Sequence, residues 1–186
     1  MTESVQIRAA EPADAALLFS WIVELAEYER AAGQVRGSQE LLADALFGAG
    51  ACVEAVIAER APGPDRVRGV PAGFALFFGT FSTWLCRPGL WLEDLYVPAA
   101  DRRRGVARAL LVHVARVAVS RRCARVEWAA LHWNTPALSF YESLGAHRLE
   151  QCRRFVSRGR RWSESPRNPR PDREPPPGRG FSVAGL

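Results

Sequence analysis

The 186-residue sequence contains no lysine, so all 25 of its basic residues are arginine. This absence excludes a lysine Schiff base and the lysine of a nucleotide-binding P-loop. The chain also has only four cysteines and three histidines, and no two cysteines have the close spacing of metal ligands. We therefore expect no metal site, and the scattered free thiols are typical of a reducing cytosol.

A long apolar run and a basic N-terminal segment are also missing. No apolar run reaches the roughly 18 residues that a membrane-spanning helix needs. The first residues, MTESVQIRAAEPAD, include acidic side chains where a signal peptide has basic ones. These absences predict a cytoplasmic protein without a membrane partner.

Positive charge is concentrated at one end of the sequence. Residues 157–186 hold seven arginines against three acidic residues, together with six of the 13 prolines, whereas residues 1–156 are nearly neutral. A segment with so little apolar content cannot offset the entropy that it would lose on ordering. We therefore expect one folded domain over residues 1–156 and a disordered tail over residues 157–186. This distribution does not favour nucleic acid as a partner of the domain.

The hydrophobic periodicity predicts a mixed α/β (α+β) layout. Alternating or continuous apolar runs predict strands at residues 5–10, 51–59, 71–83, 89–97, 124–131 and 147–156. Apolar side chains at three- or four-residue spacing predict helices at residues 11–31, 38–48, 105–121 and 135–145. Asp14 and Ser38 are the expected N-caps of the first two helices.

An arginine-rich turn precedes the third predicted helix, in the sequence VPAADRRRGVARALLVHV at residues 97–114. Gly105 allows a ligand to approach the backbone closely, and the helix that follows presents unpaired N–H groups in the same direction. This combination suits an anion such as a pyrophosphate, to which arginine adds paired donors. By itself, the arginine run is equally compatible with a solvated surface patch, and no P-loop or G-x-G-x-x-G pattern accompanies it.

Two motifs in a fixed order point to a family. Arg102-x-x-Gly105-x-Ala107 follows the apolar run WLEDLYV and precedes a long amphipathic helix, and WNTPALSFYESLGA begins at Trp133. In these motifs the sequence resembles the GCN5-related N-acetyltransferase (GNAT) superfamily. Within it, the sequence is most similar to the diamine (spermidine/spermine) and thialysine acetyltransferase group, over residues 7–156.

The resemblance implies the GNAT fold, a central, mostly antiparallel, twisted sheet that is splayed at the acetyl-CoA site and has helices on both faces. Acetyl-CoA is then the co-substrate, without a metal. Its pantetheine chain is expected along the splayed strand, at Leu95, Tyr96 and Val97. Its pyrophosphate is expected on the turn formed by Arg102, Arg103, Arg104, Gly105, Val106, Ala107 and Arg108. A further stretch of the coenzyme site matches Asn134, Thr135, Pro136 and Ala137.

The resemblance also implies roles for individual side chains. Tyr141 matches the family's general acid, which protonates the coenzyme A sulfur. Glu93 matches a carboxylate that helps to bind and deprotonate the amine, and Tyr28, Glu29 and Asp94 match positions that hold the cationic substrate. Successive strand residues point to opposite faces, so we expect only one of Glu93 and Asp94 to face the pocket, and Glu93 is the preferred candidate.

Each of these residues also fits a purely structural interpretation. Tyr141 fits ordinary helix packing, Glu93 and Asp94 fit a strand edge, and Tyr28 and Glu29 fit the polar end of a helix. Four tryptophans fit core or interface positions better than cofactor platforms, namely Trp84, Trp91, Trp128 and Trp133.

The expected function is acetyl-CoA-dependent N-acetyl transfer to a primary amine of a small cationic substrate, such as a diamine, a polyamine or a lysine-like amino acid. We expect direct attack in a ternary complex, because no cysteine occupies a motif position where it could carry the acetyl group. The resemblance implies a homodimer, and it places a further substrate acid near Glu150. Two alternatives stay open: a non-catalytic acyl-CoA-binding protein, and a protein that binds nucleic acid or another polyanion through its basic tail.

Overall fold

The computed structural model describes residues 5–61 and 69–149. The strands are β1 (Val5–Ala9), β2 (Glu54–Arg60), β3 (Val70–Ser82), β4 (Arg87–Tyr96) and β5 (Val126–Trp128). The α-helices are α1 (Ala15–Tyr28), α2 (Gln39–Phe47), α3 (Val106–Ser120) and α4 (Thr135–Ser143). Three short 3₁₀ helices are η1 (Pro12–Asp14), η2 (Ala32–Gln34) and η3 (Ala99–Asp101). Among the described residues, no helix combines the length and apolarity needed to cross a bilayer.

The chain divides into two compact units, residues 1–140 and residues 141–186. The first unit contains all five strands and α1 to α3, and the second begins within α4. The predicted boundary between residues 156 and 157 lies outside the described residues, as does the tail that follows it.

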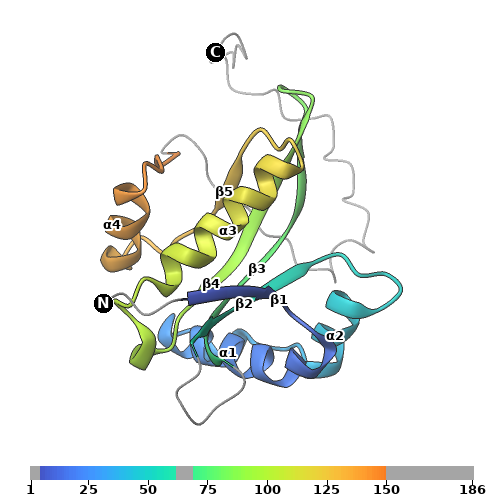
Figure 1. Cartoon of the computed structure of the whole chain (residues 1–186), viewed down its shortest axis with the longest axis vertical. Helices are drawn as coiled ribbons and strands as arrows, with labels where there is room; N and C mark the ends of the chain where they lie inside the picture. The colour runs from blue at the N-terminus through green and yellow to red at the C-terminus, as the bar shows by residue number, and fades with distance from the viewer. Residues whose placement is uncertain (1–4, 62–68, 150–186) are drawn as a thin grey trace, which may run out of the picture. The chain divides into compact units, whose positions relative to one another are not determined.

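The five strands form one sheet in the order β1-β2-β3-β4-β5 (Figure 1). Each neighbouring pair is antiparallel except β4 and β5, which are parallel. The ladder between β4 and β5 runs only from Leu90↔Val126 to Leu92↔Trp128, so the sheet opens beside the carboxyl-terminal half of β4. The expectation of a mixed fold with a mostly antiparallel, splayed sheet is confirmed.

Helices cover both faces of this sheet, as expected. On one face, α3 packs against the sheet and buries Leu110 and Val114 completely (Figure 1). On the other face, α1 and α2 form a separate core, in which the Trp21 ring stacks on Phe74 at 5.9 Å between ring centres. Leu18 of α1 is also completely buried there. Each such side chain contributes about 1.5–3 kcal/mol to folding relative to an exposed position.

The two predicted N-caps differ in the structure. Ser38 caps α2 as predicted, because its hydroxyl oxygen accepts the Leu41 N–H at 3.3 Å. Asp14 occupies the N-cap position of α1, but its side chain makes no capping bond to that helix. Its carboxylate instead accepts the Glu11 N–H at 2.8 Å and pairs with Arg8 at 2.6 Å. The predicted N-cap position is confirmed, but the side-chain bond is missing because the preceding η1 turn and the arginine of β1 both compete for the carboxylate.

The end of the domain is less regular than predicted. β5 covers only residues 126–128 of the expected strand at 124–131. Residues 147–149, the start of the last predicted strand, have no regular secondary structure, and the rest of that strand lies outside the described residues.

Candidate active site

Strand β4 contains one extra residue, Glu93. Across the ladder, Leu76 of β3 pairs with Asp94, but the next residue, Phe77, pairs with Leu92. Glu93 therefore has no partner on β3, which defines a β-bulge. The bulge lies where the ladder between β4 and β5 ends, so an irregular backbone and an open sheet edge coincide.

The strand alternation that was expected to separate Glu93 from Asp94 is interrupted, and the bulge is the physical reason. Leu92 and Leu95 both pack against the core on the α3 side of the sheet. In a regular strand, two residues on the same face are separated by one residue on the other face. Leu92 and Leu95 are separated by two residues, so Glu93 and Asp94 both lie on the α1 side. The Trp91 indole N–H donates to Glu93 Oε2 at 2.5 Å, which further fixes that carboxylate.

Three carboxylates, Glu29 at the end of α1 with Glu93 and Asp94 of β4, form what we call the acidic cluster. Burial raises the pKa of Asp94 to about 6, and the negative charges of Glu93 and Glu29 act in the same direction. Burial also raises the pKa of the Glu29 carboxyl. The ionised forms of these carboxylates are therefore destabilised, and a cation placed among them would be bound favourably.

Tyr28, the last residue of α1, is the centre of a second group of contacts. Its hydroxyl donates to Asn134 Oδ1 at 3.2 Å, and its ring centre lies 5.9 Å from that of Trp133. The Arg102 guanidinium lies 4.9 Å over the Tyr28 ring, and the Arg30 guanidinium lies 5.7 Å over Trp133. Such contacts contribute about 0.5–1 kcal/mol each at exposed sites. The structure thus brings one predicted substrate residue together with two predicted coenzyme residues.

The arginine loop, residues 102–105, has a backbone suited to an anion. Arg103 and Gly105 adopt left-handed conformations with φ of 61° and 83°, and a Cβ at Gly105 would meet no atom within 4 Å. The left-handed backbone therefore favours glycine at position 105, and the space that a side chain would occupy there is open. α3 begins at Val106, so the N–H groups of its first turn have no acceptor within the helix. This turn fits the diphosphate of coenzyme A.

Two contacts tie the arginine loop to the rest of the first unit. The buried Asp101 forms an ion pair with Arg60 of β2, with 2.7 Å between Nε and Oδ1. Arg102 Nε–H donates to the Val97 carbonyl at 3.0 Å. Neither Asp101 nor Arg60 is among the residues predicted from the sequence, although an acidic residue directly before three arginines was an available signal for Asp101.

The strand segment predicted to bind pantetheine extends beyond the β4–β5 ladder, and its Tyr96 side chain is held by a hydrogen bond. Leu95 and Tyr96 lie beyond the last pair of the β4–β5 ladder, and the Val97 carbonyl already accepts from Arg102. The Tyr96 side chain is buried on the α1 side and donates its hydroxyl to Glu24 at 2.7 Å. Burial and this bond raise the pKa of Tyr96 to about 12.

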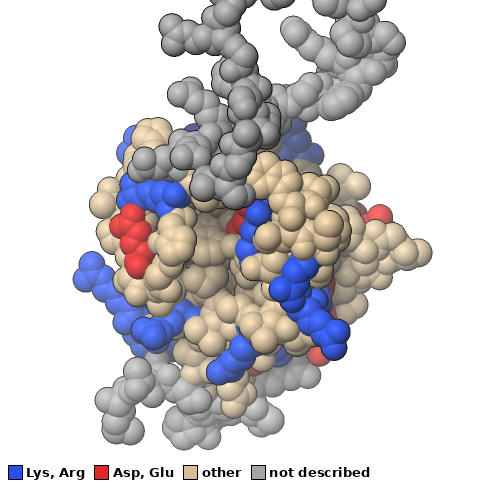
Figure 2. All heavy atoms as spheres, turned by 90° about the horizontal axis from the view of Figure 1, so that it is seen from above, with Lys and Arg blue, Asp and Glu red and all other residues tan. Residues whose placement is uncertain are grey.

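The remaining predicted coenzyme residues lie at the starts of α3 and α4. Asn134 Oδ1 accepts the Ala137 N–H at 3.4 Å, which caps the start of α4. The exposed members of the set are Arg103, Arg104, Arg108, Thr135 and Pro136, and Ala107 is half-buried. Elsewhere, on the face shown in Figure 2, arginine side chains lie in several separate groups and do not form one continuous basic surface there.

Tyr141, the predicted general acid, lies in α4 and belongs to the second unit. It is half-buried, and its carbonyl accepts the N–H groups of Leu144 at 3.0 Å and Ala146 at 3.2 Å. These bonds end the helix just before Gly145, near the predicted position. The chemical role of Tyr141 stays a prediction, and Glu150 lies outside the described residues.

Comparison with known proteins decides the family. The profile of the Acetyltransferase (GNAT) family matches residues 20–146, which is more than half of the chain. The chain belongs to the acetyltransferase (GNAT) family.

Individual relatives agree with this GNAT assignment. Thialysine N-epsilon-acetyltransferase from Sus scrofa is 36% identical over 150 residues, covering 80% of this chain and 88% of the relative. L-ornithine N5-acetyltransferase from Arabidopsis thaliana is 38% identical over 91 residues, covering 48% of this chain and 40% of the relative. Among solved structures, an integron cassette protein from V. cholerae superposes with a TM-score of 0.69 at 23% identity, covering 89% of this chain and 99% of that one. The chain is therefore an N-acetyltransferase with the GNAT fold, in a family that uses acetyl-CoA.

Proposed function

We propose that this GNAT enzyme transfers an acetyl group from acetyl-CoA to a primary amine of a small cationic substrate. The observation that carries the proposal is the acidic cluster, because the β4 bulge gathers two strand carboxylates beside Glu29 of α1. Carboxylates in such a group attract and orient a positively charged amine. Relatives named for thialysine and L-ornithine support a substrate with an amine at the end of a short carbon chain.

The arginine loop is the proposed binding site of the coenzyme diphosphate. Its glycine turn and the first N–H groups of α3 would bind phosphate oxygens, and the exposed side chains of Arg103 and Arg104 would add charge. The open edge of β4 at Leu95 and Tyr96 would pair with the amides of the pantetheine chain. Acetyl-CoA supplies a thioester whose carbonyl carbon accepts the amine.

Asp94, in place of the expected Glu93, is the proposed proton acceptor for the amine. An ammonium ion must lose a proton before its nitrogen can attack, and a base with a pKa of about 6 is ionised at neutral pH while still able to accept that proton. Glu93 and Glu29 would hold the positive charge of the substrate, with Tyr28 beside them. Attack forms the N–C bond and breaks the C–S bond, and Tyr141 is proposed to protonate the departing thiolate.

An amine panel tests this proposal directly. Putrescine, spermidine, thialysine, L-ornithine and a lysine-bearing peptide would be incubated with acetyl-CoA, and coenzyme A release would be measured. We expect release above background with at least one small amine, and a loss of about 10²-fold in kcat for Tyr141→Phe. Background release with every amine would refute the proposal, and an unchanged rate for Tyr141→Phe would remove the proposed role of Tyr141.

The resemblance to the diamine and thialysine enzymes also supports direct transfer in a ternary complex, and a homodimer in the cytoplasm. Initial rates measured against both substrates would give intersecting rather than parallel double-reciprocal lines. Sedimentation of the full chain would give the mass of two chains. Parallel lines or a monomer would each remove one of these assignments without affecting the acetyl transfer itself.

A further inference from the structure

A hollow of about 420 Å³ lies between α1, the η2 turn and α2. Apolar side chains from both helices and from the residue after η2 line it, including Ile22 and Ala26 of α1, Val35, and Leu42 of α2. Its volume falls within the range of about 300–1,000 Å³ that is usual for small-molecule sites. An apolar lining of this kind gains free energy by burying methylene groups.

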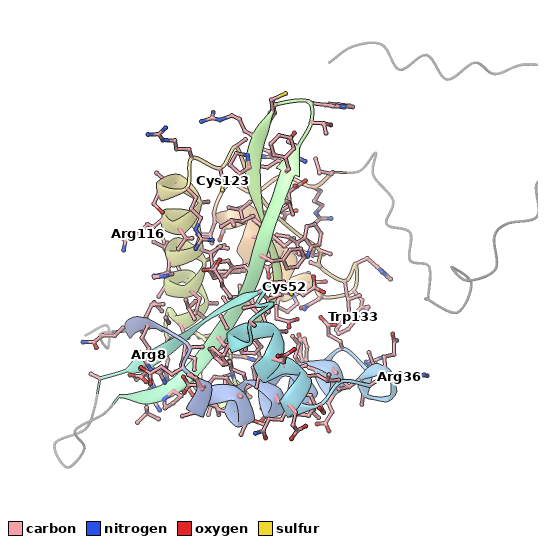
Figure 3. The ribbon with its side chains drawn as sticks, turned by 90° about the vertical axis from the view of Figure 1, so that its right-hand side faces the viewer. Arg8, Arg36, Cys52, Arg116, Cys123 and Trp133 are labelled. Carbon is pink, nitrogen blue, oxygen red and sulfur yellow. The ribbon has the colours of Figure 1, made fainter. Side chains whose placement is uncertain are left out.

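Two of the lining residues carry charge, and they differ in exposure. Arg36 is exposed, and its side chain extends outward from the segment between α1 and α2 (Figure 3). Glu29 is half-buried, and burial raises the pKa of its carboxyl. The hollow therefore offers a ligand one carboxylate and a mostly apolar wall, to which Gln34 and Ser38 add uncharged polar groups.

Glu29 also belongs to the acidic cluster, since its charge raises the pKa of Asp94. The hollow and the proposed reaction site thus share one side chain. A substrate with its reacting amine at Asp94 and a second positive nitrogen at Glu29 would direct any further carbon chain toward the hollow. A third charged nitrogen on that chain would enter an apolar space with no further carboxylate, which is unfavourable.

We propose that the hollow binds the carbon chain of the amine substrate beyond a second positive nitrogen held by Glu29. The substrate class is then an N-alkylated diamine, in preference to a polyamine of the same length. This inference rests on the proposed function of the acidic cluster.

The experiment uses N-alkyl-1,3-diaminopropanes with methyl to hexyl chains, and spermidine as the charged counterpart of the pentyl compound. Calorimetric binding in the presence of coenzyme A and the rate of acetylation would both be measured. We expect affinity to rise with each added methylene, by up to about fourfold, until the hollow is filled. The pentyl compound should bind at least tenfold more tightly than spermidine.

Two substitutions fill the hollow from different sides, Ala26→Phe on α1 and Ala31→Leu beside η2. Each should abolish the dependence on chain length while leaving binding of the methyl compound within about twofold. Ala16→Phe is the matched control, because Ala16 is exposed on the same helix and does not line the hollow. It should keep the full dependence. If Ala26→Phe fails to fold, Ala31→Leu provides the same test.

The outcomes separate this inference from the proposed function. Chain-length-dependent binding without any acetyl transfer would retain the hollow and refute the proposed function. Acetyl transfer with no dependence on chain length, or with spermidine bound as tightly as the pentyl compound, would overturn the inference alone. An equal loss of affinity for all amines in both Ala26→Phe and Ala31→Leu would overturn the inference as well.

Discussion

The arginine loop is a run of consecutive residues, whereas the acidic cluster joins the end of α1 to the middle of β4. The loop presents N–H groups and arginines, and its shape comes from left-handed backbone at Arg103 and Gly105. The cluster presents carboxylates, and its shape comes from a bulge that turns Glu93 and Asp94 to the same face. Local conformation builds the first region, and pairing between distant strands builds the second.

This contrast has a consequence for substitutions. A phosphate held by backbone N–H groups depends little on any one side chain, so single replacements in the loop should have modest effects. An amine held and deprotonated by carboxylates depends on each ionised oxygen, so single replacements there should have large effects.

Asp94→Asn should have the largest effect. Removal of the proposed base should lower kcat/KM by about 10²–10³-fold, because a positioned general base contributes that much to proton transfer. Coenzyme A binding measured by calorimetry should stay unchanged. Asp44→Asn, an exposed carboxylate on α2, is the matched control and should keep full activity. An equal loss of coenzyme binding in Asp94→Asn would show that the two regions are not separable.

The pH dependence of kcat/KM should also distinguish the acidic cluster from the arginine loop. Asp94 has a pKa of about 6, so kcat/KM should fall about tenfold per pH unit below that value, while coenzyme binding should not follow it. Stability should change in the opposite direction. Because the folded pKa lies above the ordinary 3.8, the contribution of Asp94 to the free energy of unfolding should decrease by about 2–3 kcal/mol as the pH rises from about 4 to 6.

Denaturant titration at pH 4 and pH 8 checks this sign. Asp94→Asn should be more stable than the parent chain at pH 8 and similar to it at pH 4. A variant that is less stable at both values would mean that the Asp94 charge is compensated in the folded protein.

Asp101→Asn tests the support of the arginine loop. It leaves the Arg60 guanidinium without its buried partner and should lower the free energy of unfolding by about 1–3 kcal/mol. Glu54→Gln breaks the exposed pair with Arg121 and should lower it by less than about 1 kcal/mol. Chemical denaturation of both variants gives the comparison, and equal losses would show that burial of Asp101 adds nothing.

Gly105→Ala should have the smallest effect. A Cβ has room at this position, but the left-handed backbone disfavours alanine by about 1 kcal/mol. The free energy of unfolding should therefore fall by about 1 kcal/mol, and coenzyme A affinity should fall by less than about fivefold. Gly50→Ala, where a Cβ also meets no atom within 4 Å and no left-handed backbone is required, should bind normally. A loss of more than about 100-fold would mean that the Gly105 methyl occupies space needed by the ligand.

The structure of the arginine loop, where we propose that the coenzyme binds, could be predicted in large part because its signals are local. Gly105, the arginines before it and the apolar periodicity of α3 lie within one short stretch, and so do Ser38 and the helix that it caps. The bulge at Glu93 could not be predicted, because alternation along a strand is the default and only the partner strand shows where the register shifts. The Asp101–Arg60 pair and the contact of Tyr28 with Asn134 likewise join residues that are distant in the sequence.

The sequence by itself determined the elements, the family resemblance and the turn before α3, since each follows from nearest neighbours along the chain. Only the tertiary structure decided that Glu93 and Asp94 share a face, that Glu29 raises the pKa of Asp94, and that an apolar hollow ends at the same glutamate. The physical reason is that burial and electrostatic coupling depend on distances in space. Those distances are set by strand register and helix packing.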